Sequence, residues 1–207
     1  MKKFFVSGIG TDVGKTLVAA VLTEALCADY WKPLQSGSLD YPDSAVVKDW
    51  VSNSVTKIHT EAYSFTQPLS PHTAAAIDGV EVFFDNIKAP ATNNHLIIEG
   101  SGGLMVPIDA KYCVIDLIKA LDVPVILVSA NYLGSINHTL LSLIALEKYK
   151  IPVVGIIFNG PSNASGEQAI LDRFPLKVLG RIPRLEVVNK DVVAELAAEF
   201  KDVLATL

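Results

Sequence analysis

The chain has 207 residues, of which half are hydrophobic, and a formal net charge of −5 at pH 7 with a mean hydropathy of +0.38. The acidic balance disfavours nucleic acid and anionic membranes as partners, and no apolar run approaches the roughly 20 residues that a membrane-spanning helix needs. Buried parallel strands explain the high hydropathy, because such strands are continuous apolar runs. We expect no signal peptide, reduced thiols at Cys27 and Cys113, and a cytoplasmic protein.

Strand-like apolar runs alternate with segments of helical periodicity along the whole chain. Strands are predicted at 3–7, 30–34, 95–99, 125–129, 153–158 and 177–179. Helices are predicted at 16–28, 44–52, 82–89, 114–120, 136–149, 166–174 and 191–206. This alternation indicates an α/β fold with a doubly wound, mainly parallel sheet and helices on both faces, in one domain over 1–207. Ligands of such folds bind beyond the carboxyl ends of the strands.

The most informative segment runs from Gly8 to Thr16, between the first predicted strand and the first predicted helix. It reads Gly-Ile-Gly-Thr-Asp-Val-Gly-Lys-Thr, which is a P-loop in the right context. In a P-loop, backbone N–H groups and a helix N-terminus bind phosphate oxygens. Lys15 would reach the β- and γ-phosphates, and the Thr16 hydroxyl would hold Mg²⁺. The first glycine stands one residue further from Gly14 than the strict motif has, so the loop is a variant.

Polar motifs follow the next two predicted strands. Lys32-Pro-Leu-Gln-Ser-Gly-Ser comes after the second strand, and we expect the Lys32 ammonium beside the phosphate site. Glu99-Gly-Ser-Gly-Gly comes after the third, which has the layout of a carboxylate that helps to hold Mg²⁺ next to glycines that admit a substrate. His72 and His138 are too scattered to predict a zinc site.

In their order along the chain, these motifs resemble those of the dethiobiotin synthetases of biotin biosynthesis. The family's variant P-loop, K-P-x-x-[ST]-G and E-G-[AS]-G-G motifs resemble Gly8–Thr16, Lys32–Gly37 and Glu99–Gly103. Its Y-x-[FL]-x-x-P-x-[SA]-P-H-x-A and L-G-x-I-N-H motifs are similar to Tyr63–Ala74 and Leu133–His138. Its N-[DG] and G-x-I-P motifs resemble Asn159-Gly160 and Gly180–Pro183. Each motif alone is weak, but the ordered set covers nearly the whole chain.

The resemblance implies a P-loop NTPase fold and an ATP- and Mg²⁺-dependent ring closure. In that reaction 7,8-diaminopelargonate takes up CO₂ as a carbamate, ATP phosphorylates the carbamate, and the second amine closes the cyclic urea. ADP and phosphate are released. The resemblance also implies a homodimer with the substrate site at its interface, where the start of the helix at Asn137 receives the substrate carboxylate.

The resemblance assigns roles residue by residue. It implies that Lys32 and Lys15 are catalytic. It implies substrate binding by Thr11, Ser36, Gly103 and Asn137, and Mg²⁺ binding by Thr16, Asp43 and Glu99. The residues that it implies for ATP binding are Asp12, Val13, Gly14, Lys15, Thr16, Leu17, Asp43, Glu99, Gly100, Ser101, Gly102, Asn159, Gly160, Gly180, Arg181 and Ile182. Among these, Asn159 is expected to bind adenine.

Two departures from the family pattern leave questions open. Asp12 stands where the family usually has a glutamate, so a side-chain contact there is in doubt. The metal-binding aspartate could be Asp40, Asp43 or Asp49, and we choose Asp43 because we expect it at a helix N-cap.

The alternative function is a nucleotide-switched partition or septum-positioning ATPase, which starts with the same strand, P-loop and helix. Such proteins carry a signature lysine five positions before the P-loop lysine, where this chain has Gly10. An amide-forming synthetase of corrinoid biosynthesis is a second alternative, but 207 residues leave no room for its usual glutamine-hydrolysing domain.

Overall fold

The computed structural model describes residues 1–207. Its main sheet has seven parallel strands in the order β4-β2-β6-β1-β7-β8-β9. These are β1 (Lys3–Gly8), β2 (Asp29–Trp31), β4 (Ile58–His59), β6 (Leu96–Gly103), β7 (Val125–Ala130), β8 (Val153–Asn159) and β9 (Val178–Ile182). A small parallel sheet pairs β3 (Leu34–Ser36) with β5 (Tyr63–Phe65). The doubly wound parallel fold is therefore confirmed.

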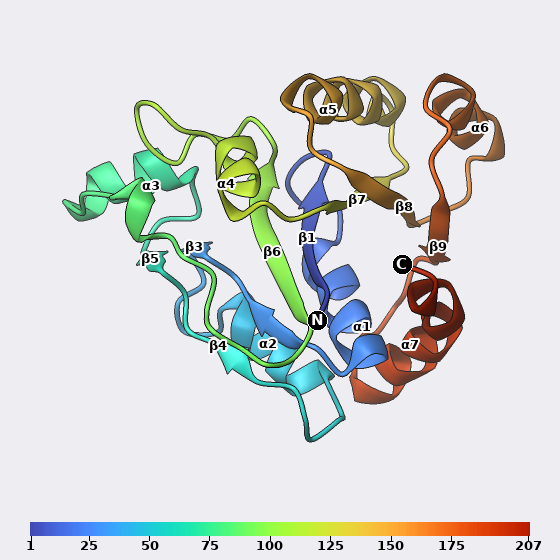
Figure 1. Cartoon of the computed structure of the whole chain (residues 1–207), viewed down its shortest axis with the longest axis horizontal. Coiled ribbons are helices and arrows are strands. Elements are labelled where there is room, and N and C mark those ends of the chain that lie inside the picture. The colour runs from blue at the N-terminus through green and yellow to red at the C-terminus, as the bar shows by residue number, and fades with distance from the viewer.

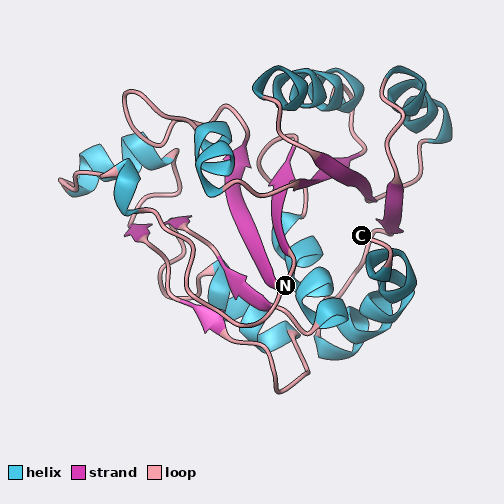
Figure 2. Cartoon of the chain, in the orientation of Figure 1, coloured by secondary structure: helices cyan, strands magenta, loops and turns pink.

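Helices cover both faces of the main sheet (Figure 1, Figure 2). One layer contains α1 (Lys15–Leu26), α2 (Asp43–Trp50) and α7 (Lys190–Ala205), and the other contains α4 (Val114–Leu121), α5 (Ser135–Tyr149) and α6 (Ala164–Arg173). The segment between β5 and β6 adds α3 (Pro71–Asp78) and a 3₁₀ turn, η1 (Phe84–Asn86). None of the helices is both long enough and apolar enough to cross a bilayer.

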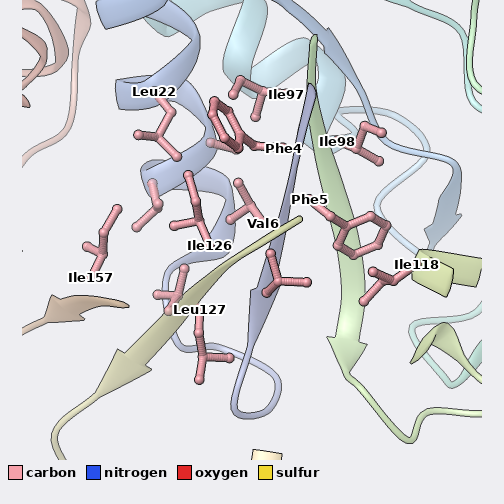
Figure 3. Close-up of a cluster of buried hydrophobic side chains, with 14 of the residues drawn as sticks. Phe4, Phe5, Val6, Leu22, Ile97, Ile98, Ile118, Ile126, Leu127 and Ile157 are labelled. Atoms are coloured by element: carbon pink, nitrogen blue, oxygen red, sulfur yellow. The ribbon is translucent and has the colours of Figure 1, made fainter. Parts of the chain in front are cut away.

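The central strand β1 places alternate side chains in the two helical layers. Figure 3 shows Phe4 on the side of α1, close to Leu22, while Phe5 points to the opposite side, toward Ile118 of α4. All four side chains belong to one core of 48 buried apolar residues. Burial on both faces explains why the strands are continuous apolar runs.

Two predicted elements are wrong. The expected helix at 82–89 is only the single turn η1, because its apolar residues anchor an irregular segment: the Phe84 ring stacks on Tyr112 with centroids 4.0 Å apart, and Ile87 is buried. The expected strand at 30–34 is two strands in different sheets. Pro33 separates them, since it has no N–H for a ladder, and its carbonyl accepts hydrogen bonds from the loop before β5.

The short strands β3, β4 and β5 and the helix α3 were not predicted. The signals for α3 were present in the sequence. Pro71 stands at its first position, where a missing N–H costs nothing, and Gly79 ends it with a φ of 66°.

Candidate active site

The P-loop joins the carboxyl end of β1 to α1, and close packing explains two of its three glycines. A Cβ at Gly14 would lie 2.1 Å from Asn159 Nδ2, and a Cβ at Gly8 would lie 2.5 Å from Val13 Cγ2. Asn159 in turn donates a hydrogen bond of 2.9 Å to the Val13 carbonyl. The predicted phosphate loop thus closes directly against the end of β8.

Asp12 adopts a left-handed conformation with a φ of 58°, which aspartate tolerates better than most residues that carry a Cβ. Its side chain is exposed at the rim of the cavity described below. Local backbone geometry thus suits aspartate at this position as a loop residue.

Lys15 is a buried cation, with 7% of the residue exposed. Its Nζ folds back and donates a hydrogen bond of 2.9 Å to the Gly10 carbonyl. Burial lowers the pKa of Lys15 to about 8; the Glu99 carboxylate opposes this shift and the Lys32 charge adds to it. A desolvated lysine on a loop of inward backbone N–H groups favours an incoming anion.

Glu99, in the middle of β6, is 1% exposed and uses both carboxylate oxygens. Oε1 accepts hydrogen bonds from Thr16 Oγ1 at 2.8 Å and from Lys32 Nζ at 3.2 Å. Oε2 accepts one from the Tyr30 hydroxyl at 2.7 Å. Glu99 therefore links the start of α1 to β2 and to the short connection between β2 and β3.

Tyr30 is a residue of this site that sequence reasoning missed. Burial and the negative charge of Glu99 raise the pKa of Tyr30 well above its ordinary value, so its hydroxyl stays a donor. A signal was available, because residues two apart in an extended segment face the same side and Tyr30 precedes Lys32 by two.

Lys32 makes ion pairs with both Asp43 and Glu99. Burial disfavours its charge, but the two carboxylates, Glu99 foremost, overcome this and raise the pKa of Lys32. The side chain is therefore an ammonium ion at neutral pH.

Two of the three candidate aspartates differ in their surroundings. Asp43 lies on Lys32, beside Glu99, whereas Asp49 accepts a hydrogen bond from Tyr41 on the exposed surface. The expected N-cap role of Asp43 is wrong. Pro42 is the N-cap of α2, Asp43 is its first residue, and the Asp43 side chain points to Lys32 because the buried ammonium demands a counter-ion.

A cavity of about 730 Å³ lies over the P-loop and these charges. Eleven predicted residues line it: Thr11, Asp12, Gly14, Lys15, Thr16, Lys32, Ser36, Asp43, Glu99, Ser101 and Gly102. Seven further residues, which the assigned roles did not include, complete it: Gln35, Ser38, Pro68, Leu69, Ser70, Pro71 and Val106. Ser36 Oγ is buried with no hydrogen-bond partner. Val13, Leu17, Gly100 and Gly103 belong to the same loops and helix but do not line this cavity.

The predicted adenine-binding residues lie apart from this cavity, at the ends of β8 and β9. Asn159 and Ile182 pair across the two strands, and Gly160 follows with a φ of 93°. Gly180 has a packing reason to be glycine, since a Cβ there would lie 2.6 Å from the Phe200 ring of α7.

Arg181 of β9 is held by two other elements. It pairs with Glu167 of α6, and its guanidinium lies 5.7 Å from the centroid of the Phe158 ring. One guanidinium nitrogen, Nη1, is buried without a partner. A polar group of that kind is available to a ligand at the ends of these strands.

Asn137 is not beside the P-loop within one chain. It lines a second cavity, of about 780 Å³, with residues of the β7–α5 loop, of α5 and of the loop before α6. The same face exposes several large apolar side chains, namely Leu133, Ile136, Leu141 and Ile144. Leu133 is fully exposed.

The donor set of Thr16, Asp43 and Glu99 fits Mg²⁺. This ion is usually held by one or two carboxylates, with nucleotide phosphates and water completing its shell. Two carboxylates and one hydroxyl converge here beside the P-loop. No group of three or more histidine, cysteine, aspartate or glutamate side chains forms a metal site elsewhere in the chain.

Solved structures support the fold. A ParA-family ATPase from Chlorobium tepidum covers 99% of this chain and 92% of its own at a TM-score of 0.56 and 16% identity. The cell division ATPase MinD from Pyrococcus furiosus covers 98% of this chain and all of its own at a TM-score of 0.59 and 15% identity. At such identities the likeness extends to the fold alone.

Sequence relatives give the family. A family model described as an AAA domain matches residues 2–192. The ATP-dependent dethiobiotin synthetase BioD of Christiangramia forsetii is 50% identical over 97% of this chain and 96% of its own length. BioD of Cytophaga hutchinsonii is 48% identical over 98% of both chains. With its P-loop, buried lysines and paired carboxylates in the predicted places, the chain belongs to the ATP-dependent dethiobiotin synthetase family.

Proposed function

We propose that this chain catalyses the ATP-dependent ring closure of 7,8-diaminopelargonate with CO₂, giving dethiobiotin, ADP and phosphate in biotin biosynthesis. The observation that carries the proposal is the convergence of two buried ammonium groups and two carboxylates on a cavity that adjoins a P-loop. Family membership at 50% identity supports the choice of substrate. The partition-type alternative has only fold likeness behind it.

The chemistry needs positive charge where negative charge develops. Carbamate formation and its phosphorylation both create anionic groups, and preorganised cations lower such barriers most effectively. Lys15 would act on the nucleotide phosphates from the P-loop, and Lys32 would act on the carbamate from the opposite wall of the cavity. The unpartnered hydroxyl of Ser36 and the hydroxyl of Thr11 would orient the diamine.

Mg²⁺ would be held by Thr16, Asp43 and Glu99, and when bound it supplies charge neutralisation between the phosphates. The nucleotide base would lie at Asn159, Gly160 and the Gly180–Ile182 strand end. The side-chain nitrogen of Asn159 makes the contact with Val13, so the side-chain oxygen is not used in that contact. An amide oxygen in that position can accept a hydrogen bond from an exocyclic amine.

We also propose that the enzyme is a cytoplasmic homodimer and that the start of α5 completes the partner's site. Asn137 lies far from its own P-loop cavity, on a face that exposes Leu133 and Ile136. An apolar face of this kind suits an interface. The exposed N–H groups of the helix start suit a carboxylate.

Phosphate release from ATP, followed with and without 7,8-diaminopelargonate and bicarbonate, tests the proposal. We expect turnover only when diamine and bicarbonate are both present, because the carbamate is the phosphoryl acceptor. Dethiobiotin should appear in equal amount to phosphate when the products are quantified by mass spectrometry. Rapid hydrolysis that ignores the diamine would instead favour a switch ATPase.

A further inference from the structure

We infer that Lys32 is the resident cation of the metal site, and that the Lys32 ammonium and the divalent ion occupy the two carboxylates in turn. The inference rests on the proposed function, which places the metal at Thr16, Asp43 and Glu99. It assigns to Lys32 a second task, before its proposed action on the carbamate: it holds the empty metal site together.

The hydrogen bonds on Glu99 place the Thr16 hydroxyl and the Lys32 ammonium on the same carboxylate oxygen. Oε2 is committed to the Tyr30 hydroxyl at 2.7 Å in a fully buried contact. Oε1 receives Thr16 Oγ1 at 2.8 Å and Lys32 Nζ at 3.2 Å. A metal that binds Thr16 together with the Glu99 oxygen beside it therefore approaches the oxygen that Lys32 already contacts.

The second carboxylate repeats this overlap. Asp43 pairs with the same ammonium through Oδ2. Lys32 thus contacts both carboxylates of the proposed metal site. Only 6% of this residue is exposed to solvent. A metal ion that displaced the Lys32 ammonium from one carboxylate would also weaken the ion pair between Lys32 and the other carboxylate.

Charge explains why one cation is needed and two are unfavourable. Without any cation, Glu99 would be a buried carboxylate with Asp43 as its nearest anion, which is a costly arrangement. With a divalent ion and the ammonium both in place, three positive charges would crowd two negative ones. The stable states have either Lys32 or the metal between the carboxylates.

The exchange has a functional consequence. Lys32 lines the cavity, so an ammonium released from the carboxylates remains within the substrate site. Metal entry would then deliver Lys32 to the reacting groups, and the site would gain its second catalytic cation only after the metal has bound.

Titration of the protein with Mn²⁺ alone, followed by electron paramagnetic resonance of the free ion, tests the exchange. Lys32→Met keeps the length of the side chain and removes its charge. The matched control is Lys48→Met, which removes an exposed lysine from α2, the helix that carries Asp43. We expect Lys32→Met to bind Mn²⁺ about tenfold or more tightly than the wild type, because a competing charge at contact distance is gone. Lys48→Met should match the wild type.

A measurement on the unaltered protein separates displacement from simple repulsion. The ammonium protons of Lys32 should be protected from solvent exchange in nuclear magnetic resonance spectra, and added Mg²⁺ should abolish that protection. Equal Mn²⁺ affinity of Lys32→Met and wild type, or protection that survives Mg²⁺ saturation, would overturn the exchange.

The outcomes also separate this inference from the proposed function. Diamine-dependent turnover together with unchanged Mn²⁺ affinity in Lys32→Met would leave the function standing and remove the exchange. Tighter Mn²⁺ binding in Lys32→Met, found together with a wild type that shows no diamine-dependent turnover, would keep the exchange and refute the function. Absence of Mn²⁺ binding in all three proteins would refute the metal site, and the exchange with it.

Discussion

At the scale of single residues, burial sets the charges of the site. Lys15 and Lys32 are both almost fully buried, but their surroundings differ. Lys32 has two carboxylate partners and its pKa rises, whereas Lys15 donates only to a carbonyl and its pKa falls to about 8. The two cations should therefore respond differently to pH.

We expect nucleotide affinity to fall as the pH rises through the alkaline range. In the free protein Lys15 loses its proton near pH 8, and bound phosphate raises its pKa. The part of the nucleotide affinity that depends on the Lys15 ammonium is thus complete below the pKa that Lys15 has in the free protein. It is lost as the pH rises through the higher pKa that Lys15 has in the complex. Calorimetric titration with ADP between about pH 7 and about pH 9.5 measures this. Lys15→Gln should bind weakly with no such slope, and a parallel slope in that variant would exclude Lys15 as its source.

We expect the Tyr30 hydroxyl to affect the Mg²⁺ concentration that turnover requires. Tyr30→Phe frees Glu99 Oε2 and removes a hydrogen bond to a charged group, a loss that typically costs about 1.5–3 kcal/mol. We expect the Mg²⁺ concentration for half-maximal turnover to rise about tenfold, because Glu99 is no longer held for its ligand role. Tyr41→Phe, which removes the exposed hydroxyl on Asp49, is the control. Equal Mg²⁺ dependence of the two variants would place Tyr30 outside this role.

At the scale of elements, strong periodicity was predictable and local rearrangement was not. The strands that became β1, β7 and β8 are long apolar runs, and their prediction was confirmed within a residue, whereas β6 continues to Gly103, four residues beyond its predicted end. The P-loop, the Lys32 motif and Glu99 could be placed together because the carboxyl ends of parallel strands share one edge.

The failures have physical reasons that lie outside any short window of sequence. Phe84 and Ile87 have helical spacing but serve as anchors on a neighbouring loop and the core. Asp43 has the chemistry of an N-cap residue, yet a buried ammonium from the connection between β2 and β3 outweighs the capping bond. Tyr30 was given no role from the sequence, and the pairing of β2 with β6 brings its hydroxyl to Glu99.

The start of α5 should act in the neighbouring chain's site. Lys15→Gln and Asn137→Trp should each be inactive alone, the first through its P-loop and the second through a blocked helix start. A mixed dimer then holds one site with both faults and one with neither. Equal mixing should restore about a quarter of wild-type turnover, since half of the dimers are mixed and each has one good site. Turnover that stays absent after subunit exchange is verified by mass spectrometry would refute a shared site.

At the scale of the whole molecule, a second polar network closes the edge of the sheet opposite the active site. Asp29, at the start of β2, accepts hydrogen bonds from the Thr92 hydroxyl, the His59 ring, the Asn94 amide and the backbone N–H of Lys57. Burial raises the pKa of Asp29, but these bonds outweigh it and the pKa lies below its ordinary value. One carboxylate thus ties three segments of the chain together.

Asp29→Asn should lower the free energy of unfolding by about 2 kcal/mol at neutral pH, because several bonds to a charged acceptor are weakened. A depressed carboxyl pKa gives stability that is present above the unfolded value of about 4 and is lost as the pH falls through the folded value. The difference from wild type should therefore shrink below about pH 4. Urea unfolding at both pH values measures it, with the exposed Asp202→Asn as the control. Equal stability of the two variants at neutral pH would contradict the prediction.

The place of β1 in the sheet has a consequence for biosynthesis. The strand is synthesised well before its two neighbours in the sheet, as the pairs Lys3 with Leu96 and Phe5 with Val125 show. At about 5–20 residues per second, the nascent segment Phe4-Phe5-Val6 waits several seconds for a partner. Until then it is an apolar segment open to chaperones and to aggregation. The nucleotide cannot hasten this stage, because its loop does not exist before β1 is enclosed. ATP can protect only the finished molecule.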